Sequence, residues 1–313
     1  MSGAARSFPG GRRAREPSAG MSTLPGATKA WLQIHFCVVL WGFTAILGKL
    51  IELAALPLVW WRMTLVAAVL LLAPRFWRGV RRIARRQSAI YVGIGVIVAL
   101  HWVTFYGSVK LANASVAATC MALCPVFIAF VEPFVVGRPF RGRELVFALA
   151  VVPGVALVVG GTPAHMGPGI VVGVSSAFLV AIFASLNKRF ISGGDPLAVT
   201  GLEMSGGALF LTLLALLPDT AGVFALPDAR DALLLIVLAL GCTLLPFALS
   251  LVALRHLSAF ATTLAVNMEP VYAIVLAIAL LGEQHELDPG FYLGVAIILV
   301  VVFSQPLIMR VRR

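Results

Sequence analysis

Residues 120–137, CMALCPVFIAFVEPFVVG, and residues 265–282, AVNMEPVYAIVLAIALLG, carry one pattern twice. Both have Pro-Val from the sixth position onward and both end on glycine, so Pro125 pairs with Pro270 and Gly137 with Gly282. The pairing continues without a gap over residues 99–138 and 244–283, at a shift of 145 positions, with five identities in forty pairs. The identity is low, so the repeat needs support from elsewhere in the chain.

A second stretch supplies that support at nearly the same spacing. At a shift of 139 positions the start of one half matches the start of the other, pairing Ala45, Leu47, Lys49, Pro57 and Leu58 with Ala184, Leu186, Lys188, Pro196 and Leu197. The two offsets differ by only six residues, which indicates an internal duplication of the whole unit.

Each copy contains long apolar segments of the length that crosses a bilayer. The chain of 313 residues is 60% hydrophobic and only 12% charged, so an ordinary soluble domain is excluded. We expect an all-α membrane protein with ten transmembrane helices, over residues 31–50, 58–73, 89–109, 113–136, 144–161, 169–190, 197–217, 231–254, 258–281 and 290–308. The short second span is expected to gain a turn from the adjoining residues 75–77.

An odd number of spans per copy inverts the second copy relative to the first. Five spans in residues 31–161 and five in residues 169–308 form two inverted repeats, an arrangement that carriers use to open one central site alternately to two compartments.

Charge supports this inversion and sets the orientation. Lys and Arg accumulate in cytoplasmic connections, and an inside N-terminus puts 20 of the 24 basic residues on the cytoplasmic side. Both termini are then cytoplasmic. The net charge of +11 follows from topology and from attraction to anionic lipid, so we expect the bilayer as a partner and no nucleic acid. Residues 1–30 are polar and basic and are expected to form a disordered tail, in which Met21 is an alternative start.

Short motifs with this order and placement resemble the drug/metabolite transporter superfamily, in its ten-helix branch with two EamA-type repeats. They are Trp41-Gly42, Lys49, Pro57, Arg62, Glu269-Pro270 and Leu281-Gly282-Glu283. The resemblance covers residues 33–305 and implies a transporter in a bacterial inner membrane. It also implies a central cavity formed mainly by the third, fourth, eighth and ninth spans and by parts of the first and sixth. Arg138 departs from the pattern, because the first repeat often has a glutamate where the second has Glu283.

Glu269 is the first candidate for a functional side chain. It lies at the middle of the ninth span beside Pro270 and two residues after Asn267, and ionisable groups at membrane depth usually serve function. We expect these residues to bind substrate or couple transport to protons. The alternative is a carboxyl that only joins two helices.

His101 lies at the same depth in the third span, and it either contacts the ligand or bonds to a neighbouring carbonyl. Trp41, Trp102 and Tyr106 could line a cavity for an aromatic or cationic guest, or could face lipid or core. Lys49 either caps the first helix or, as the resemblance implies, borders the cavity.

Four further residues receive structural or mechanical interpretations. Pro125 and Pro270 are expected to act as hinges at site depth, or to set static kinks. Arg62 is expected to extend back toward the outer surface, and Glu203 to bond across a close helix contact.

A secondary transporter of a small organic metabolite such as an amino acid, working outward and with protons as a candidate coupling ion, fits these features best. The alternative within this class is a broad-specificity exporter of lipophilic cations, and a homodimer stays open. An intramembrane lipid-processing enzyme is disfavoured, because at membrane depth the five His residues form no metal-ligand grouping and no two carboxylates are closely spaced. A receptor or scaffold is disfavoured, because the sequence shows no appended signalling domain or long loop. We expect no metal and no cofactor, and ATP use is disfavoured because no GxxxxGK[ST] loop is present.

Overall fold

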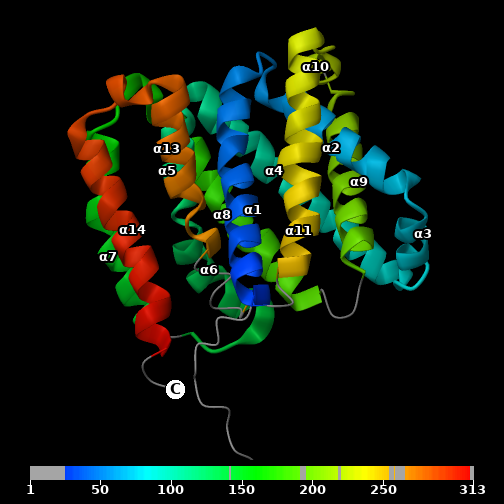
Figure 1. The fold of residues 1–313 in the computed structure, drawn as a ribbon, viewed down its shortest axis with the longest axis horizontal. Helices are drawn as coiled ribbons and strands as arrows, with labels where there is room; N and C mark the ends of the chain where they lie inside the picture. The colour runs from blue at the N-terminus through cyan, green and yellow to red at the C-terminus, as the bar shows by residue number, and fades with distance from the viewer. Residues whose placement is uncertain are drawn as a thin grey trace, which may run out of the picture.

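A computed structural model describes residues 25–140, 142–190, 195–217, 220–253, 257 and 265–310. These residues form helices and no strand (Figure 1). The helices are α1 (Pro25–Leu50), α2 (Ala55–Leu72), α3 (Pro74–Val80), α4 (Arg85–Leu111), α5 (Ala114–Met121), α6 (Cys124–Glu132), α7 (Gly142–Gly160), α8 (Gly167–Phe190), α9 (Pro196–Leu214), α10 (Ala229–Ile236), α11 (Leu245–Ala253), α13 (Glu269–Leu281) and α14 (Pro289–Arg310). Two π-helical segments, η1 (Pro133–Gly137) and η4 (Val237–Leu244), and three short 3₁₀ turns, η2 (Ala164–Met166), η3 (Ala221–Phe224) and η5 (Glu283–His285), complete the described part.

Seven helical segments within the described residues are long and apolar enough to span a membrane. They are Thr28–Leu50, Ala55–Leu72, Arg85–Leu111, Ala114–Gly137, Ala164–Phe190, Pro196–Leu214 and Ala229–Phe247. Three shorter apolar helices accompany them, Val146–Gly160, Glu269–Leu281 and Pro289–Ser304. The all-helical membrane class that the sequence predicts is therefore present.

The start of α1 corrects the predicted tail. Residues 25–30 are helical, because Pro25 supplies a preset backbone angle at a helix start, where its missing N–H costs nothing. The rest of the predicted tail, with Met21, lies outside the described residues.

The second span gains its extra length at the end opposite to the predicted one. α2 begins at Ala55 and stops at Leu72, where Ala73 is extended with φ −80° and ψ 121°. Pro74 causes this stop, because proline disfavours a helical conformation in the residue before it. Residues 75–77 therefore belong to the separate helix α3, and the prediction that they lengthen the span is wrong.

The helices of the two halves pack in a reciprocal pattern. α1 contacts η4, α11 and α13, and α8, its counterpart in the second half, contacts α4, α5 and α6. α2 packs on α9, and α7 packs on α14 at one edge of the molecule (Figure 1). Each of these contacts thus has an equivalent in which the corresponding helices of the two halves are exchanged. This is expected for two interlocked copies related by a two-fold axis.

Glycines allow the closest of these approaches. A Cβ atom added at Gly95 of α4 would overlap the backbone carbonyl of Glu203 on α9, and one at Gly206 would lie 2.8 Å from the Cα of Val92. Small residues let the backbones of two membrane helices approach closely. Van der Waals contact between them then stabilises the pair, because the hydrophobic effect does not drive helix association within lipid. The α4–α9 contact forms one wall of the interior.

Candidate functional site

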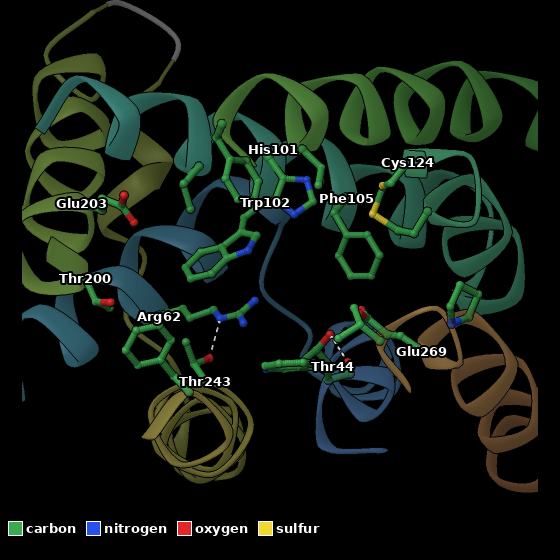
Figure 2. Close-up of a pocket in the computed structure, with 18 of the residues that line it drawn as sticks. Thr44, Arg62, His101, Trp102, Phe105, Cys124, Thr200, Glu203, Thr243 and Glu269 are labelled. Atoms are coloured by element: carbon green, nitrogen blue, oxygen red, sulfur yellow. Dashed lines mark hydrogen bonds between the residues drawn. The ribbon is translucent and has the colours of Figure 1, made fainter. Parts of the chain in front are cut away.

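A cavity of about 570 Å³ lies where the two halves meet (Figure 2). Its volume is within the range of roughly 300–1,000 Å³ that is usual for small-molecule sites. The lining side chains come from α1, α2, α4, α5, α6, α8, α9, η4, α11, α13 and α14, with further residues from the breaks beside α6 and α13. The second and seventh spans contribute to the wall, although the resemblance does not include them among the spans that form the cavity.

Two interrupted helices meet the cavity at equivalent positions. α6 begins after Leu123 and α13 begins after Met268, and these two residues have nearly the same backbone angles, φ −80° and −76° with ψ −10° in both. They are 145 positions apart, the shift of the sequence repeat. Pro125 and Pro270 each follow two residues later and line the cavity. Since proline lacks the N–H that a continuous helix would need, the breaks are encoded at these positions.

Glu269 lines the cavity in the first turn of α13, and its neighbours Asn267 and Pro270 line it as well. Neither of its carboxylate oxygens has a hydrogen-bond partner in the part of the chain that the structure describes. No hydrogen bond from this carboxyl to another helix therefore supports the alternative role, in which it only joins two helices, among those residues.

His101 is buried at the cavity wall and is held by α8. Its Nδ1 lies 2.8 Å from the hydroxyl of Ser176, and that hydroxyl donates to the main-chain carbonyl of His101 at 2.9 Å. Because the single hydroxyl proton is used on the carbonyl, the neutral ring must carry its proton on Nδ1 and donate it to Ser176. Nε2 then keeps a free lone pair. No direct bond joins His101 to Glu269 within the described residues.

Arg62 lies in the middle of the cavity, and this placement corrects its predicted position near the outer surface. The side chain is 4% exposed, and Figure 2 shows it between His101 and Trp102 on one side and Thr243 on the other. Nη1 donates to the hydroxyl of Tyr106 at 2.7 Å, and Nε donates to Thr243 at 3.0 Å. The guanidinium carbon lies 3.7 Å from the centre of the Trp102 ring, a cation–π contact.

The π-helical geometry of η4 orients the Thr243 hydroxyl so that it accepts the hydrogen bond from Arg62. The hydroxyl of Thr243 donates to the carbonyl of Leu238, five residues earlier, at 2.8 Å. With its proton committed there, the oxygen can only accept, so it faces Arg62 as an acceptor. π segments inside helices are frequent at functional sites.

Glu203 is the second buried carboxyl of the cavity wall, and sequence reasoning assigned it to helix packing. It is 7% exposed, lines the cavity with Thr200 from α9, and its Oε1 has no partner among the described residues. In the view of Figure 2, Glu203 and Glu269 lie at opposite ends of the cavity with Arg62 between them.

The sequence does contain a signal for the buried position of Arg62. This residue lies about 10 Å along α2 from the start of the helix, well below the membrane surface.

The other predicted site residues divide into two groups. Trp41 and Trp102 line the cavity. Tyr106 is fully buried behind the wall and reaches the site through Arg62. Lys49 is exposed at the end of α1 and is not part of the cavity lining.

The end of the molecule where α1 stops is closed by packing and by hydrogen bonds. The terminal turns of several helices form one buried cluster there, including Ala45, Ile46, Leu47, Ile51, Leu58, Val59, Val109, Ala114, Ala117, Leu235 and Leu238. The carboxylate of Asp231 accepts the main-chain N–H groups of Glu52 and Leu53 at 3.0 and 3.1 Å, and the ammonium of Lys110 donates to the carbonyl of Ile51.

The opposite end is crossed by ion pairs. Glu132 accepts from Arg138 at 3.0 Å and from Lys188 at 2.6 Å. The Arg138 pair lies within the fourth span and its following loop, and the Lys188 pair joins them to the end of α8.

The model of the EamA-like transporter family matches residues 28–160 and 167–304. The chain belongs to this family. The resemblance stated from the sequence motifs is thereby confirmed.

Individual relatives agree with this assignment. The chain is 23% identical over 201 residues to the uncharacterized transporter YyaM of Bacillus subtilis (strain 168), a match that covers 58% of this chain and 65% of that relative. A protein of known crystal structure has the same fold, with a TM-score of 0.58 and 17% identity over 91% of this chain and 99% of its own.

Proposed function

We propose that this EamA transporter is a secondary carrier that exports a small organic metabolite, such as an amino acid, by alternating access. The supporting observation is the cavity, which lies where two interrupted helices with matching break geometry meet, one from each half. Discontinuous helices at the interface of inverted repeats are typical of secondary transporters. The three shorter apolar helices, added to the seven long segments, would complete ten spans as two inverted repeats over residues 31–161 and 169–308.

The direct test is transport by the purified protein in vesicles. Preloaded vesicles should exchange an unmodified external solute for internal solute when amino acids, nucleosides and organic cations are screened, with and without a pH gradient. Exchange of organic cations alone would favour the alternative, a broad-specificity exporter of lipophilic cations, for which the aromatic wall and the two carboxyls of the cavity are suited. Chemical conversion of a lipid, without exchange of any solute, would contradict the proposal and indicate that the protein is an enzyme.

The orientation that we propose puts both termini in the cytoplasm of a bacterial cell, in the inner membrane. The closed end of the molecule then faces outward, and the cavity lies nearer the cytoplasm, toward which Thr200 and Phe247 extend its wall. This arrangement corresponds to a form closed to the outside.

Cysteine labelling in intact cells tests this orientation. We expect Gln284→Cys, in the exposed 3₁₀ turn η5, to react with a membrane-impermeant maleimide, whereas Arg82→Cys, exposed after α3, should react only after the cells are opened. Both variants are made in a background without the four native thiols. Labelling of position 82 in intact cells would reverse the proposed topology.

We assign the hinge role to the breaks before α6 and α13. Alternating access needs elements with two arrangements around a fixed site, and the two prolines put a bendable point in each half at cavity depth. Pro125 and Pro270 are therefore proposed as hinges.

Glu269 is proposed as the coupling residue. A carboxylate at membrane depth is costly unless it is paired or protonated, and Glu269 interacts with Arg62 over a longer distance but has no hydrogen bond to a described residue. The charged or titratable groups that share its cavity are Arg62 of α2, His101 of α4, Cys124 of α6 and Glu203 of α9. A proton on Glu269 would neutralise it when no other ligand is present.

Glu269→Gln should abolish accumulation driven by a pH gradient, because the amide keeps the shape of the side chain and cannot take up a proton. Solute exchange at equal pH should persist at a rate within about tenfold of wild type. The control is Glu52→Gln, which changes an exposed carboxylate whose ion pair with Arg230 is worth little. Full pH-driven accumulation by Glu269→Gln would remove the residue from the coupling mechanism.

A further inference from the structure

Arg62 is a permanently charged group that is held rigidly inside the cavity. Three groups from two other elements fix it, the ring of Trp102, the hydroxyl of Tyr106 and the hydroxyl of Thr243. All three are neutral, so they orient the guanidinium without neutralising its charge. Such fixation reduces the entropy that a ligand must remove when it binds.

The guanidinium forms no direct ion pair with a carboxylate among the described residues. Within the described residues no carboxylate oxygen lies within 4.0 Å of the guanidinium, and Glu203 and Glu269 lie at opposite ends of the cavity (Figure 2). Nη2, the second terminal nitrogen of Arg62, has no hydrogen-bond partner there either. A buried charge at membrane depth is costly without a counter-charge in direct contact, and Glu269 interacts with Arg62 only over a longer distance, so a bound anion could still pair with the guanidinium.

The planar guanidinium favours one kind of counter-charge. Its parallel N–H groups match the two oxygens of a carboxylate, whereas an ammonium or a quaternary amine would be repelled. The aromatic and aliphatic side chains Trp41, Phe105, Met121, Ile128 and Phe183 form an apolar wall around the same space and suit an apolar body attached to that group.

We infer that Arg62 is the anchor for a carboxylate group of the substrate, and that the transported solutes are organic carboxylates with an apolar body. This inference rests on the proposed transport function and narrows it, because it disfavours lipophilic cations. Trp102, Tyr106 and Thr243 act as positioning residues, which hold the guanidinium toward the cavity.

A matched set of four probes tests the chemical class without any mutation. L-leucine and 4-methylpentanoate carry the carboxylate, whereas L-leucinamide and 3-methylbutylamine have the same apolar body without it. We expect the two carboxylates to raise the melting temperature of the purified full-length protein in a concentration-dependent manner, and the amide and the amine to bind at least about tenfold more weakly. Equal or tighter binding of the amine, or no binding of either carboxylate, would overturn the inference.

Variants of Arg62 then test the anchor itself. Arg62→Gln removes the charge and should weaken carboxylate binding at least about tenfold, and Arg62→Lys, which keeps the charge but loses the paired donors, should weaken it less. Arg230→Gln, at an exposed arginine, serves as the control and should bind like wild type. Wild-type carboxylate binding by a folded Arg62→Gln protein would overturn the assignment.

Solute exchange in vesicles separates this inference from the proposed function. Exchange of amines by wild type and by Arg62→Gln alike would leave the transport function standing and refute the carboxylate anchor. Carboxylate binding that depends on Arg62, without exchange of any bound solute, would support the anchor and refute transport.

Discussion

Gly95→Ala and Gly206→Ala should each prevent the protein from reaching a stable folded state. The added methyl group would meet backbone atoms of the facing helix, the carbonyl of Glu203 in one case and Val92 in the other. Backbone cannot move aside as the end of a flexible side chain can, so α4 and α9 would have to separate. We expect a loss of at least about 3 kcal/mol in the free energy of unfolding, the upper part of the range for overpacked sites.

The measurement is the yield of monodisperse protein after solubilisation, together with its melting temperature. Gly93→Ala is a matched control, because it lies on the same helix two residues from Gly95 and an added Cβ there meets nothing within 4 Å. Its helix propensity should even improve. Normal yield and melting temperature for Gly95→Ala would show that the two helices are less tightly joined than the structure indicates.

Two physical rules explain how much of this fold the sequence predicts. Apolar segments of bilayer length must be helical, because every backbone group in lipid has to be bonded within its own segment. Proline marks where such helices break, and the structure has breaks beside Pro125 and Pro270, which the sequence predicts as hinges or kinks inside their spans. The second span does not gain residues beyond Pro74, because this proline holds Ala73 in an extended conformation.

The cavity was harder to predict than the helices. Depth along a span can be counted, and it places Trp41, His101 and Glu269 near one level, where the structure has them lining one cavity. The rotation of each helix about its axis cannot be counted, because nearly all faces of these spans are apolar. Tyr106 therefore could not be distinguished from the neighbouring Phe105, which lines the cavity in its place. Lys49 lies outside the cavity for a different reason, because it is exposed at the end of α1.

Arg62 shows why contacts between distant segments decide the site. Its partners Tyr106 and Thr243 are 44 and 181 residues away in the chain. A long basic side chain near a membrane surface usually extends to water, and only the combination of the two hydroxyls and the Trp102 ring makes the inward direction favourable. Those groups come together only after the halves have packed.

With the proposed orientation and alternating-access mechanism, Glu283→Gln should shift the transporter toward a form that is open at its outer end. Glu283 is 1% exposed, and its two carboxylate oxygens accept the main-chain N–H groups of Ala114 and Ser115 at 2.9 and 2.7 Å. These N–H groups are at the start of α5, where the helix dipole also favours a negative charge. The bonds join the turn after α13 to the start of α5, and thus one half of the protein to the other.

Outward opening by alternating access requires the halves to separate at this end, so these bonds stabilise the closed form selectively. An amide can accept with only one atom and carries no charge, which should cost the closed form about 2 kcal/mol. This difference corresponds to a shift of roughly 30-fold in the ratio of the two forms. Solute exchange should slow, because the return to the closed form becomes unfavourable.

The shift can be measured through Ala117, which is fully buried in the closed outer half. In a background without native thiols, Ala117→Cys should react with an impermeant maleimide from outside at least about tenfold faster when Glu283→Gln is present. Glu286→Gln, one turn away and bonded only to the side chain of Asn113 among the described residues, is the matched control and should change the rate little. Equal labelling rates with and without Glu283→Gln would mean that this contact does not hold the outer end closed.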